Sequence, residues 1–335
     1  MPDDPVAALP ERLRERTRAG RPRPMPFMLA VLTDEYFSDP DWVYERKLDG
    51  ERVLAVRDGP DVRLVSRNDR TLNGHYPEIV EALEAQPCER FVVDGEVVAF
   101  ESGRTSFARL QQRMQVSDPQ RARATGVAVF YYVFDLLHVA GHDVVALPLR
   151  ERKTLLRKAI AFGKPLRFTT HRREHGERYL AEACRRGWEG LIAKRADAPY
   201  TGRRSGDWLK FKCVAEQELV IGGFTEPAGS RVGFGALLVG HYDDGRFVYA
   251  GKVGTGYDRA TLTRLRGQLD ELERTDPPFD GMSKRQRGVH WVEPELVAQI
   301  GFTEWTTDGM LRHPRYLGLR DDKDPRDVVR ERPRP

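Results

Sequence analysis

Short runs in which apolar and polar residues alternate occupy much of the first two thirds of the chain, a pattern typical of β-strands. Residues 42–48 (WVYERKL) alternate in this way and are followed by the turn pair Asp49-Gly50. Residues 91–100 (FVVDGEVVAF) form two short apolar runs about a second Asp-Gly pair, so they predict a hairpin. The long apolar run over residues 127–137 (VAVFYYVFDLL) predicts a buried strand.

Helical segments follow in the same region, and a change of pattern marks a second region after them. Helices are expected over residues 76–84, 106–115, 149–161 and 177–186, with further strands at LRFTT, GLIAK and WLKFK. Near Val214 the chain changes to short strands and glycine turns, with one helix over residues 257–272. This predicts a small barrel of about five strands after a boundary at residues 212–216.

Length and composition fit two folded domains. The chain has 335 residues, of which 40% are hydrophobic and 32% charged, and this excludes global disorder. No apolar stretch is long enough to span a membrane. Lys and Arg (55) exceed Asp and Glu (51) only slightly, so the charge permits a polyanionic partner without requiring one. Cys88, Cys184 and Cys213 are too few for a four-cysteine zinc site or a disulfide framework, which predicts a reduced, cytoplasmic protein.

The segment from Glu45 to Arg52 (ERKLDGER) places a lysine, Lys47, at the end of a predicted strand. A lysine is a nucleophile only when neutral, and its ordinary pKa of ~10.4 leaves little free amine at pH 7. Neighbouring cations lower that pKa, and the candidates here are Arg52, Lys210 and Lys212. Taken alone, the segment is more typical of a hairpin with exposed charges.

Two further groups of charged residues are candidates for metal and phosphate binding. Glu96, within the DGE triplet, and Glu189 each place a carboxylate beside an apolar strand. Two such carboxylates could hold Mg²⁺, although acids at strand ends are common in turns. Lys210 and Lys212 lie two residues apart in a predicted strand, so both point to one face. Adjacent ammonium groups repel each other unless an anion lies between them, which favours phosphate as a ligand.

One motif predicts a different chemistry. Residues 171–175 (HRREH) match a zinc-protease pattern in which a helix brings both histidines to one face. A β-rich run precedes this segment and Gly176 follows it directly, so a loop is expected and zinc is not.

Seven short motifs occur in a fixed order along the chain: KLDGER, SRN, DGE, FDLL, EGLIAK, WLKFK and RDDK. Together they resemble the covalent nucleotidyltransferase superfamily and, more closely, the ATP-dependent DNA ligases, in particular the ligase module of bacterial end-joining ligases and its stand-alone relatives. The resemblance runs from about Met25 to Lys323. It implies an α+β fold, in which an antiparallel-sheet nucleotidyltransferase domain (ATP-grasp-like) precedes a β-barrel OB-fold domain. The expected parts are a loose basic arm (1–24), the adenylation domain (25–213), the OB-fold domain (214–325) and a charged tail (326–335).

The resemblance also implies roles for individual residues. Lys47 would attack the α-phosphorus of ATP and carry AMP, and Asp49 would help to position it. Glu45 would contact the adenine amino edge, directly or through its backbone. Arg52 and Arg67 would touch the ribose and, later, the 5′-phosphate of DNA.

Further implied roles concern the metal, the base and the phosphates. Glu96 would bind the ribose hydroxyls, and both Glu96 and Glu189 would hold the metal, Mg²⁺ or alternatively Mn²⁺. Phe134 would stack on adenine, although an ordinary core position explains it equally well. Lys210 and Lys212 would grip the α-phosphate.

The barrel domain would complete the first step, since Arg320 and Lys323 would orient the pyrophosphate leaving group. The expected reaction seals nicks between a 3′-hydroxyl and a 5′-phosphate in duplex DNA, through a lysyl-AMP and then a DNA-adenylate, in repair or end joining. The expected partners are nicked duplex DNA and a Ku-like end-binding protein or other repair enzymes. The protein is expected to be a monomer without membrane contacts, in the cytoplasm and associated with the nucleoid.

Rival functions remain open at this point. An RNA ligase or an mRNA-capping guanylyltransferase of the same superfamily shares the lysine motif. A non-catalytic DNA-end binding module is an alternative of another class, for which Lys47 would be dispensable.

Overall fold

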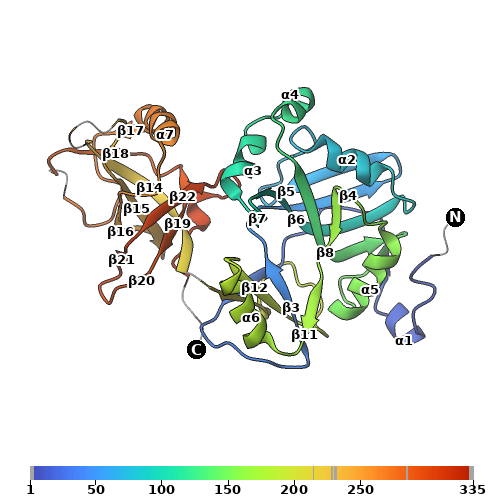
Figure 1. Ribbon diagram of the computed structural model, residues 1–335. Helices are drawn as coiled ribbons and strands as arrows, with labels where there is room; N and C mark the ends of the chain where they lie inside the picture. Colours follow the sequence, from blue (N-terminus) through green and yellow to red (C-terminus); the bar gives the residue numbers. More distant parts are fainter. Residues whose placement is uncertain (1–3, 214, 228, 230–231, 284–285, 332–335) are drawn as a thin grey trace. The chain divides into compact units, whose positions relative to one another are not determined.

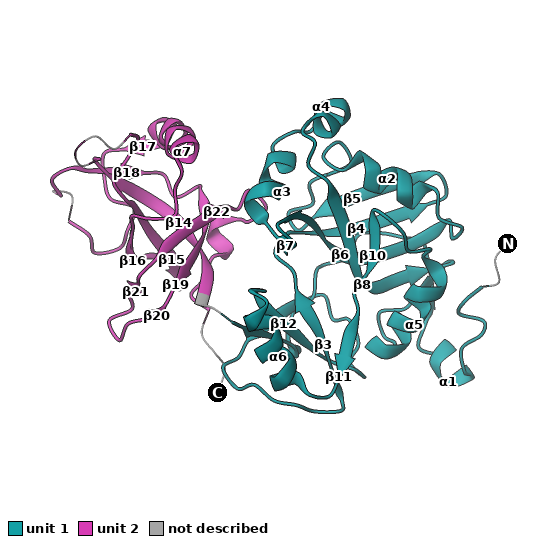
Figure 2. Cartoon of the chain, viewed as in Figure 1, with its two compact units in different colours: residues 1–213, 333–335 teal, residues 214–332 magenta. Residues whose placement is uncertain are grey.

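The computed structural model describes the chain except for residues 1–3, 214, 228, 230–231, 284–285 and 332–335. The chain divides into two compact units, the first ending at Cys213 and the second covering residues 214–332 (Figure 2). Within the described residues, every helix is too short or too polar to cross a membrane.

A largely antiparallel sheet of eight strands forms one half of the first unit (Figure 1). Its order is β1-β9-β8-β6-β4-β5, with β10 beside β8 and β7 beside β6. The bounds are β1 (Arg18–Ala19), β4 (Glu51–Asp58), β5 (Asp61–Ser66), β6 (Arg90–Glu101), β7 (Arg104–Thr105), β8 (Val129–Val139), β9 (His142–Asp143) and β10 (Leu166–Phe168).

A second sheet of five strands, in the order β11-β3-β12-β13-β2, completes the first unit. The bounds are β2 (Leu29–Leu32), β3 (Trp42–Lys47), β11 (His171–Arg173), β12 (Gly190–Arg195) and β13 (Arg204–Lys212). The helices of this unit are α1 (Glu11–Arg14), α2 (Pro77–Glu84), α3 (Phe107–Met114), α4 (Pro119–Ala124), α5 (Leu149–Ala159) and α6 (Gly176–Arg185).

Alternating side chains of the two sheets build three apolar layers. One face of the eight-stranded sheet packs against α2, α3 and α5, and its core includes Val53, Ile79 and Leu155. The opposite face meets the five-stranded sheet, where Leu54 and Trp208 belong to one cluster. The far face of the five-stranded sheet packs against α6 through residues that include Trp42, Tyr44, Tyr179, Leu191 and Phe211. The two sheets therefore face each other, and helices cover their outer sides.

The predicted hairpin over residues 91–100 is wrong, because this segment is part of the single twelve-residue strand β6. The Asp-Gly pair does not turn the chain. Gly95 is required for a different reason: a Cβ atom there would lie 2.5 Å from the ring of Tyr131 and 2.6 Å from the carbonyl oxygen of Tyr132. The glycine thus allows β8 to approach β6 closely, which sequence pattern alone does not distinguish from a turn.

The predicted loose arm over residues 1–24 is also wrong where the structure describes it. Val6 and Leu13 are buried in the main core of the first unit. Strand β1 pairs with β9, so this segment is an integral edge of the eight-stranded sheet. Residues 1–3 lie outside the described residues.

The second unit is built on a sheet of seven strands in the order β16-β15-β14-β18-β17, with β19 pairing to both β14 and β22. Helix α7 (Arg259–Glu271) buries Leu262, Leu265 and Leu269 against this sheet. The strands are β14 (Ala215–Thr225), β15 (Leu237–Asp243), β16 (Arg246–Val253), β17 (Glu273–Arg274), β18 (Val289–Val292), β19 (Val297–Phe302) and β22 (Arg315–Leu319), with β20 (Glu304–Trp305) and β21 (Leu311–Arg312) as a separate pair.

Part of the predicted charged tail over residues 326–335 is packed rather than free. A 3₁₀ turn covers Pro325–Asp327, and Val328 is buried in the second unit. The amide of Tyr242 donates to the carbonyl of Val328 at 2.7 Å. Residues 332–335 lie outside the described residues.

Candidate active site

Three neighbouring strands bring the predicted phosphate-binding and nucleophilic lysines into one row. In the β3–β12–β13 register, Lys47 is opposite Gly190, and Gly190 is opposite Lys212. Strands in a sheet lie about 4.8 Å apart, and directly opposed residues share a face. Lys47 and Lys212 are therefore on the same face, separated by one strand whose residue in that row has no side chain. A Cβ atom on Gly190 would lie 1.9 Å from the carbonyl oxygen of Phe211.

The next row of the same face continues the arrangement. Glu45 is opposite Ile192, and Ile192 is opposite Lys210. Because side chains two residues apart share a face, Glu45, Lys47, Lys210 and Lys212 all project from one side of the sheet. This side is the one that meets the eight-stranded sheet, since Ile192 and Trp208 belong to the cluster between the sheets.

Lys47 forms an ion pair with Glu189, which directly precedes β12. Both carboxylate oxygens lie 2.5 Å from the ammonium nitrogen. The side chains are 20% and 9% exposed, so the pair is largely shielded from water. A carboxylate at this distance stabilises the charged amine. Glu189 is therefore an anionic neighbour of Lys47 that the expectation of neighbouring cations did not include.

Glu45 is buried and binds two lysines instead of facing an open site. Its carboxylate pairs with Lys153 of α5 and, at 2.6 Å, with Lys194 of β12. Lys153 also donates to the carbonyls of Phe134 and Thr169, each at 3.2 Å. Burial alone would raise the pKa of Glu45, but the two ammonium groups outweigh burial and lower it. Both oxygens of the Glu45 carboxylate are thus paired with lysines, and of the two expected modes of contact with adenine only the one through the backbone would leave these ion pairs intact.

Arg52 is held by a carboxylate to which the sequence analysis assigned no role of its own. Its guanidinium donates to both oxygens of Asp94, at 3.1 and 2.7 Å, and the Tyr200 hydroxyl donates to the same carboxylate at 2.8 Å. Burial opposes the charge of Arg52, but Asp94 outweighs it and raises the arginine pKa. Asp94 is fully buried, and the Arg52 guanidinium lies 5.3 Å from the ring centre of Phe134 and 5.4 Å from that of Trp208.

The predicted adenine-stacking residue lies at this same place. Phe134 of β8 packs edge-on against Trp208 of β13, with ring centres 6.0 Å apart. The ammonium of Lys194 lies 4.1 Å from each of these two ring centres. Glu96 of β6 is directly opposite Arg52 of β4. The eight-stranded sheet therefore places Phe134, Arg52 and Glu96 on adjacent strands.

The segment that carries Asp49 crosses from one sheet to the other. Strand β3 ends at Lys47 in the five-stranded sheet, and β4 begins at Glu51 in the eight-stranded sheet. A Cβ atom on Gly50 would lie 2.1 Å from the carbonyl oxygen of Val97, so only glycine lets this link pass β6. The link places Asp49 beside the strand that contains Glu96. Arg67 directly follows β5 and is half-buried.

Glu96 and Glu189 are the predicted metal ligands, and their chemistry fits Mg²⁺, which is usually bound by one or two carboxylates together with water and phosphate. The described residues contain no group of three or more His, Cys, Asp or Glu side chains arranged to hold a metal. Within the part of the chain that the structure describes, a metal held by Glu96 and Glu189 would need further ligands from outside the protein side chains, such as water.

Arg320 and Lys323 belong to the second unit and both form ion pairs inside it. Arg320 donates to both oxygens of Asp322, each at 2.9 Å, and the pair is buried. Lys323 pairs with Glu218 at 3.2 Å. Neither acidic partner, Asp322 or Glu218, has an expected role from the sequence.

Cysteine and histidine residues provide two corrections. Cys184 and Cys213 are joined by a disulfide, which the low cysteine count had not led us to expect, whereas Cys88 is free. His171 lies in the strand β11, where a loop was expected, and His175 directly precedes α6 with a φ of 53°, so the two histidines do not share a helix. Burial lowers the pKa of His171 to about 4, and the nearby Lys153 adds to this effect.

Comparison with known proteins assigns the chain to a family. The ATP dependent DNA ligase domain matches residues 27–212, and the ATP dependent DNA ligase C terminal region matches residues 230–323. The multifunctional non-homologous end joining protein LigD of Pseudomonas aeruginosa is 37% identical over 99% of this chain and 40% of that protein. A DNA ligase of Natronomonas pharaonis is 33% identical over 91% of this chain and 57% of that ligase.

A solved structure described as mycobacterial DNA ligase D complexed with ATP and MES is 34% identical, with a TM-score of 0.65, and covers 92% of this chain and 98% of the solved chain. The predicted fold class is confirmed by this likeness. The chain spans about two fifths of the length of the LigD proteins that it matches. More than half of its residues match the catalytic domain, and so the chain belongs to the family of ATP-dependent DNA ligases.

Proposed function

We propose that this chain seals nicks in duplex DNA with ATP, through a lysyl-AMP on Lys47 and a DNA-adenylate. The observation that carries the proposal is the single row that contains Lys47, Gly190 and Lys212, with Glu189 bound to Lys47. A nucleophile, a phosphate-binding cation and a carboxylate meet there on one face of one sheet.

In the first step, the neutral amine of Lys47 attacks the α-phosphorus of ATP. A bond forms between nitrogen and phosphorus, and the bond from that phosphorus to the bridging oxygen breaks, which releases pyrophosphate. Phosphoryl transfer depends on positioning and charge neutralisation more than on covalent help. Lys210 and Lys212 offset the charge of the α-phosphate, and Asp49 orients Lys47.

Lys47 must leave Glu189 before it can react, because that carboxylate stabilises the ammonium form. Glu96 and Glu189 would hold Mg²⁺, or alternatively Mn²⁺, whose chemistry there is to neutralise phosphate charge. If Glu189 bound the metal, it would no longer pair with Lys47, and the ammonium form of Lys47 would lose that stabilisation.

Adenine stacks on Phe134, and the backbone at Glu45 contacts the amino edge of adenine. Glu96 binds the ribose hydroxyls. Arg52 and Arg67 contact the ribose and later the 5′-phosphate of DNA, and for this Arg52 must share or leave Asp94. In the second unit, Arg320 and Lys323 orient the pyrophosphate, which requires them to exchange Asp322 and Glu218 for phosphate oxygens.

In the later steps AMP passes to the 5′-phosphate at the nick, and the 3′-hydroxyl then displaces AMP. The names of the LigD relatives favour end joining as the process served. The proposed partners are nicked DNA and a Ku-like end-binding protein, and the proposed site of action is the nucleoid of the cytoplasm.

One gel assay tests the proposal. The protein is incubated with Mg²⁺ and a nicked duplex, together with ATP, GTP or NAD, and sealing is expected with ATP alone. Lys47→Ala should fail on the ordinary nick but should still seal a nick whose 5′ end already carries AMP, because that substrate bypasses the first step. Sealing of an ordinary nick by Lys47→Ala, or a preference for nicked RNA, would contradict the proposal.

A further inference from the structure

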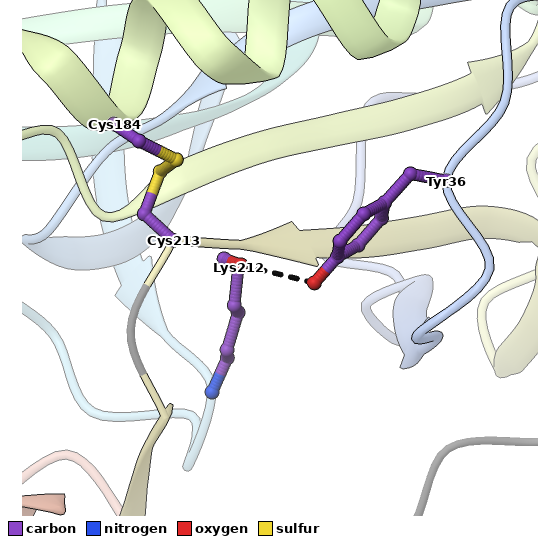
Figure 3. Close-up of a disulfide and its surroundings, with 4 residues drawn as sticks. All are labelled: Tyr36, Cys184, Lys212 and Cys213. Carbon is purple, nitrogen blue, oxygen red and sulfur yellow. Dashed lines mark hydrogen bonds between the residues drawn. A yellow bond between two sulfur atoms is a disulfide. The ribbon is translucent and has the colours of Figure 1, made fainter. Parts of the chain in front are cut away.

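The disulfide joins two segments at one end of the proposed active site (Figure 3). Cys184 lies in the last turn of α6, and Cys213 directly follows Lys212 at the end of β13. The two Cα atoms are 5.2 Å apart, and 29 residues separate the cysteines in sequence. Cys213 also ends the continuous segment, residues 1–213, that makes up most of the first unit.

The loop that this bond closes contains much of the proposed chemistry. Glu189, Lys210 and Lys212 all lie between Cys184 and Cys213. The amide of Cys213 donates to the carbonyl of Glu189 at 3.0 Å, so one half of the disulfide is bonded directly to the residue that pairs with Lys47. The covalent bond therefore fixes the end of the row that contains Lys47, Gly190 and Lys212.

Tyr36 holds the same strand end from another side. Its hydroxyl donates to the carbonyl of Lys212 at 3.1 Å, as the dashed line in Figure 3 marks. Its ring lies 5.1 Å from that of Phe211. The backbone of Lys212 is thus fixed by one hydrogen bond and, at the next residue, by the disulfide.

The disulfide is open to exchange chemistry. Cys184 is exposed, and a thiolate must reach one of the two sulfurs for exchange to begin. Disulfides that occur in reducing compartments are mostly transient or redox-sensing, whereas structural ones persist in oxidising compartments. An accessible disulfide in a protein proposed to act in the cytoplasm fits the first group.

We propose that the Cys184–Cys213 pair is a redox-responsive positioning element for Glu189 and Lys212, and that lysyl-AMP forms faster in the disulfide form than in the dithiol form. This rests on the proposed function. The exchange partner is a small thiol and its disulfide. Two such thiols reduce the pair through a mixed disulfide, so that the protein S–S bond breaks, one small-molecule S–S bond forms, and two protein thiols result.

The first test compares the two redox forms of the unchanged protein. After removal of any bound AMP with pyrophosphate, the rate of AMP transfer from ATP is measured by intact mass in oxidised and fully reduced samples. Supporting groups around a metal ligand typically contribute 10–100-fold, and we expect reduction to slow the step on the order of tenfold. Cys184→Ser and Cys213→Ser should be slow in both conditions, and Cys88→Ser should keep the full redox response.

The second test measures the coupling between nucleotide binding and disulfide formation, and it requires no catalytic turnover. If the disulfide form binds nucleotide better, then nucleotide must favour the disulfide by the same factor. The dithiol–disulfide equilibrium is measured by thiol alkylation in a series of thiol/disulfide buffers, with and without AMP and Mg²⁺. A tenfold shift corresponds to about 30 mV for this two-electron couple. A disulfide that only stabilises the fold would change the melting temperature but would leave this equilibrium unmoved by AMP.

The outcomes separate this inference from the proposed function. Equal AMP-transfer rates in the oxidised and reduced protein would overturn the redox role and leave ligation intact. Absence of AMP transfer in both forms would contradict the proposed function itself. Persistence of the redox response in Cys184→Ser would assign it to another group and would likewise overturn the inference.

Discussion

The two faces of the five-stranded sheet use the same strands for opposite purposes. On the face toward the eight-stranded sheet, Glu45, Lys47 and Lys210 are charged, and Glu45 and Lys47 each form ion pairs. On the face toward α6, the alternate residues Tyr44, Leu191 and Phe211 are fully buried and apolar. Residues adjacent in sequence therefore serve different purposes, one supplying a charged group and the next a buried apolar side chain, because successive side chains of a strand point to opposite faces.

This contrast teaches how the site is kept in place. The apolar face anchors β3, β12 and β13 to α6, while the opposite face is left to hold charges in a fixed register. A single-residue slip between these strands would exchange the two faces. Substitutions on the two faces should consequently separate activity from stability, and two comparisons test this, while a third prediction concerns the pH dependence of stability.

The largest effect is expected from Lys47→Arg. Arginine keeps the positive charge beside Glu189 but does not lose its proton, so it cannot act as a nucleophile. AMP transfer should fall on the order of 10⁴-fold or more, as is typical when a covalent nucleophile is removed. Intact mass should show no adenylate, and thermal unfolding should be nearly unchanged. The matched control is Arg46→Lys on the other face, whose side chain lies over Trp188 and which should keep AMP transfer within a few-fold.

A second comparison uses neighbours in β13. Phe211→Ala should lower the free energy of unfolding by about 3–5 kcal/mol, because it empties a fully buried site. Its AMP transfer per folded molecule should change little. Lys210→Ala, one residue away, should show the reverse pattern, with slowed AMP transfer and a stability change below about 1 kcal/mol. Denaturant titration measures the first quantity and intact mass the second. Similar behaviour of both variants would refute the division between the faces.

The smallest effect concerns pH. His171 is opposite Glu45 in the β11–β3 register, and Lys153, Arg157 and Arg173 are also nearby; burial lowers its pKa to about 4. Between pH 6.5 and about 4 the unfolded chain binds a proton that the folded chain does not, so stability falls as pH falls through this window.

His171→Asn should therefore flatten the decline of the unfolding free energy over that window, as measured by denaturant titration at several pH values. His138, whose pKa burial also lowers to about 4, should still supply part of the slope. A profile for His171→Asn that matches the unchanged protein would show that the imidazole is charged in the folded state.

Much of the first unit was predictable because its strands and helices follow simple periodicity. The helices at 76–84, 106–115, 149–161 and 177–186 and the buried strand at 127–137 were found within a few residues. The Asp94-Gly95 pair led to the wrong prediction of a hairpin, because a glycine needed for close approach of two strands cannot be told in sequence from a glycine in a turn. The disulfide was missed since two cysteines separated by 29 residues give no pairing signal.

The interaction partners of the candidate site residues could not be predicted from the sequence. Lys194 lies within the EGLIAK motif, yet nothing in the sequence connects it with Glu45. Lys153 lies on a helix with no motif of its own and reaches Glu45 from a distant part of the chain. Such partners depend on how the sheets and α5 pack, so they could be identified only once the fold was known. The roles assigned to Glu45, Arg52 and Glu189 stay predictions.

The buried trio of Glu45, Lys153 and Lys194 carries one carboxylate against two ammonium groups, all three almost fully shielded from solvent. Loss of the carboxylate alone would leave two buried ammonium groups without their anion, a change that lowers the free energy of unfolding by about 3–5 kcal/mol in comparable cases. Substitutions at these three positions should therefore be correlated among homologous chains. Where the acid is replaced, at least one of the two lysines is expected to be replaced as well.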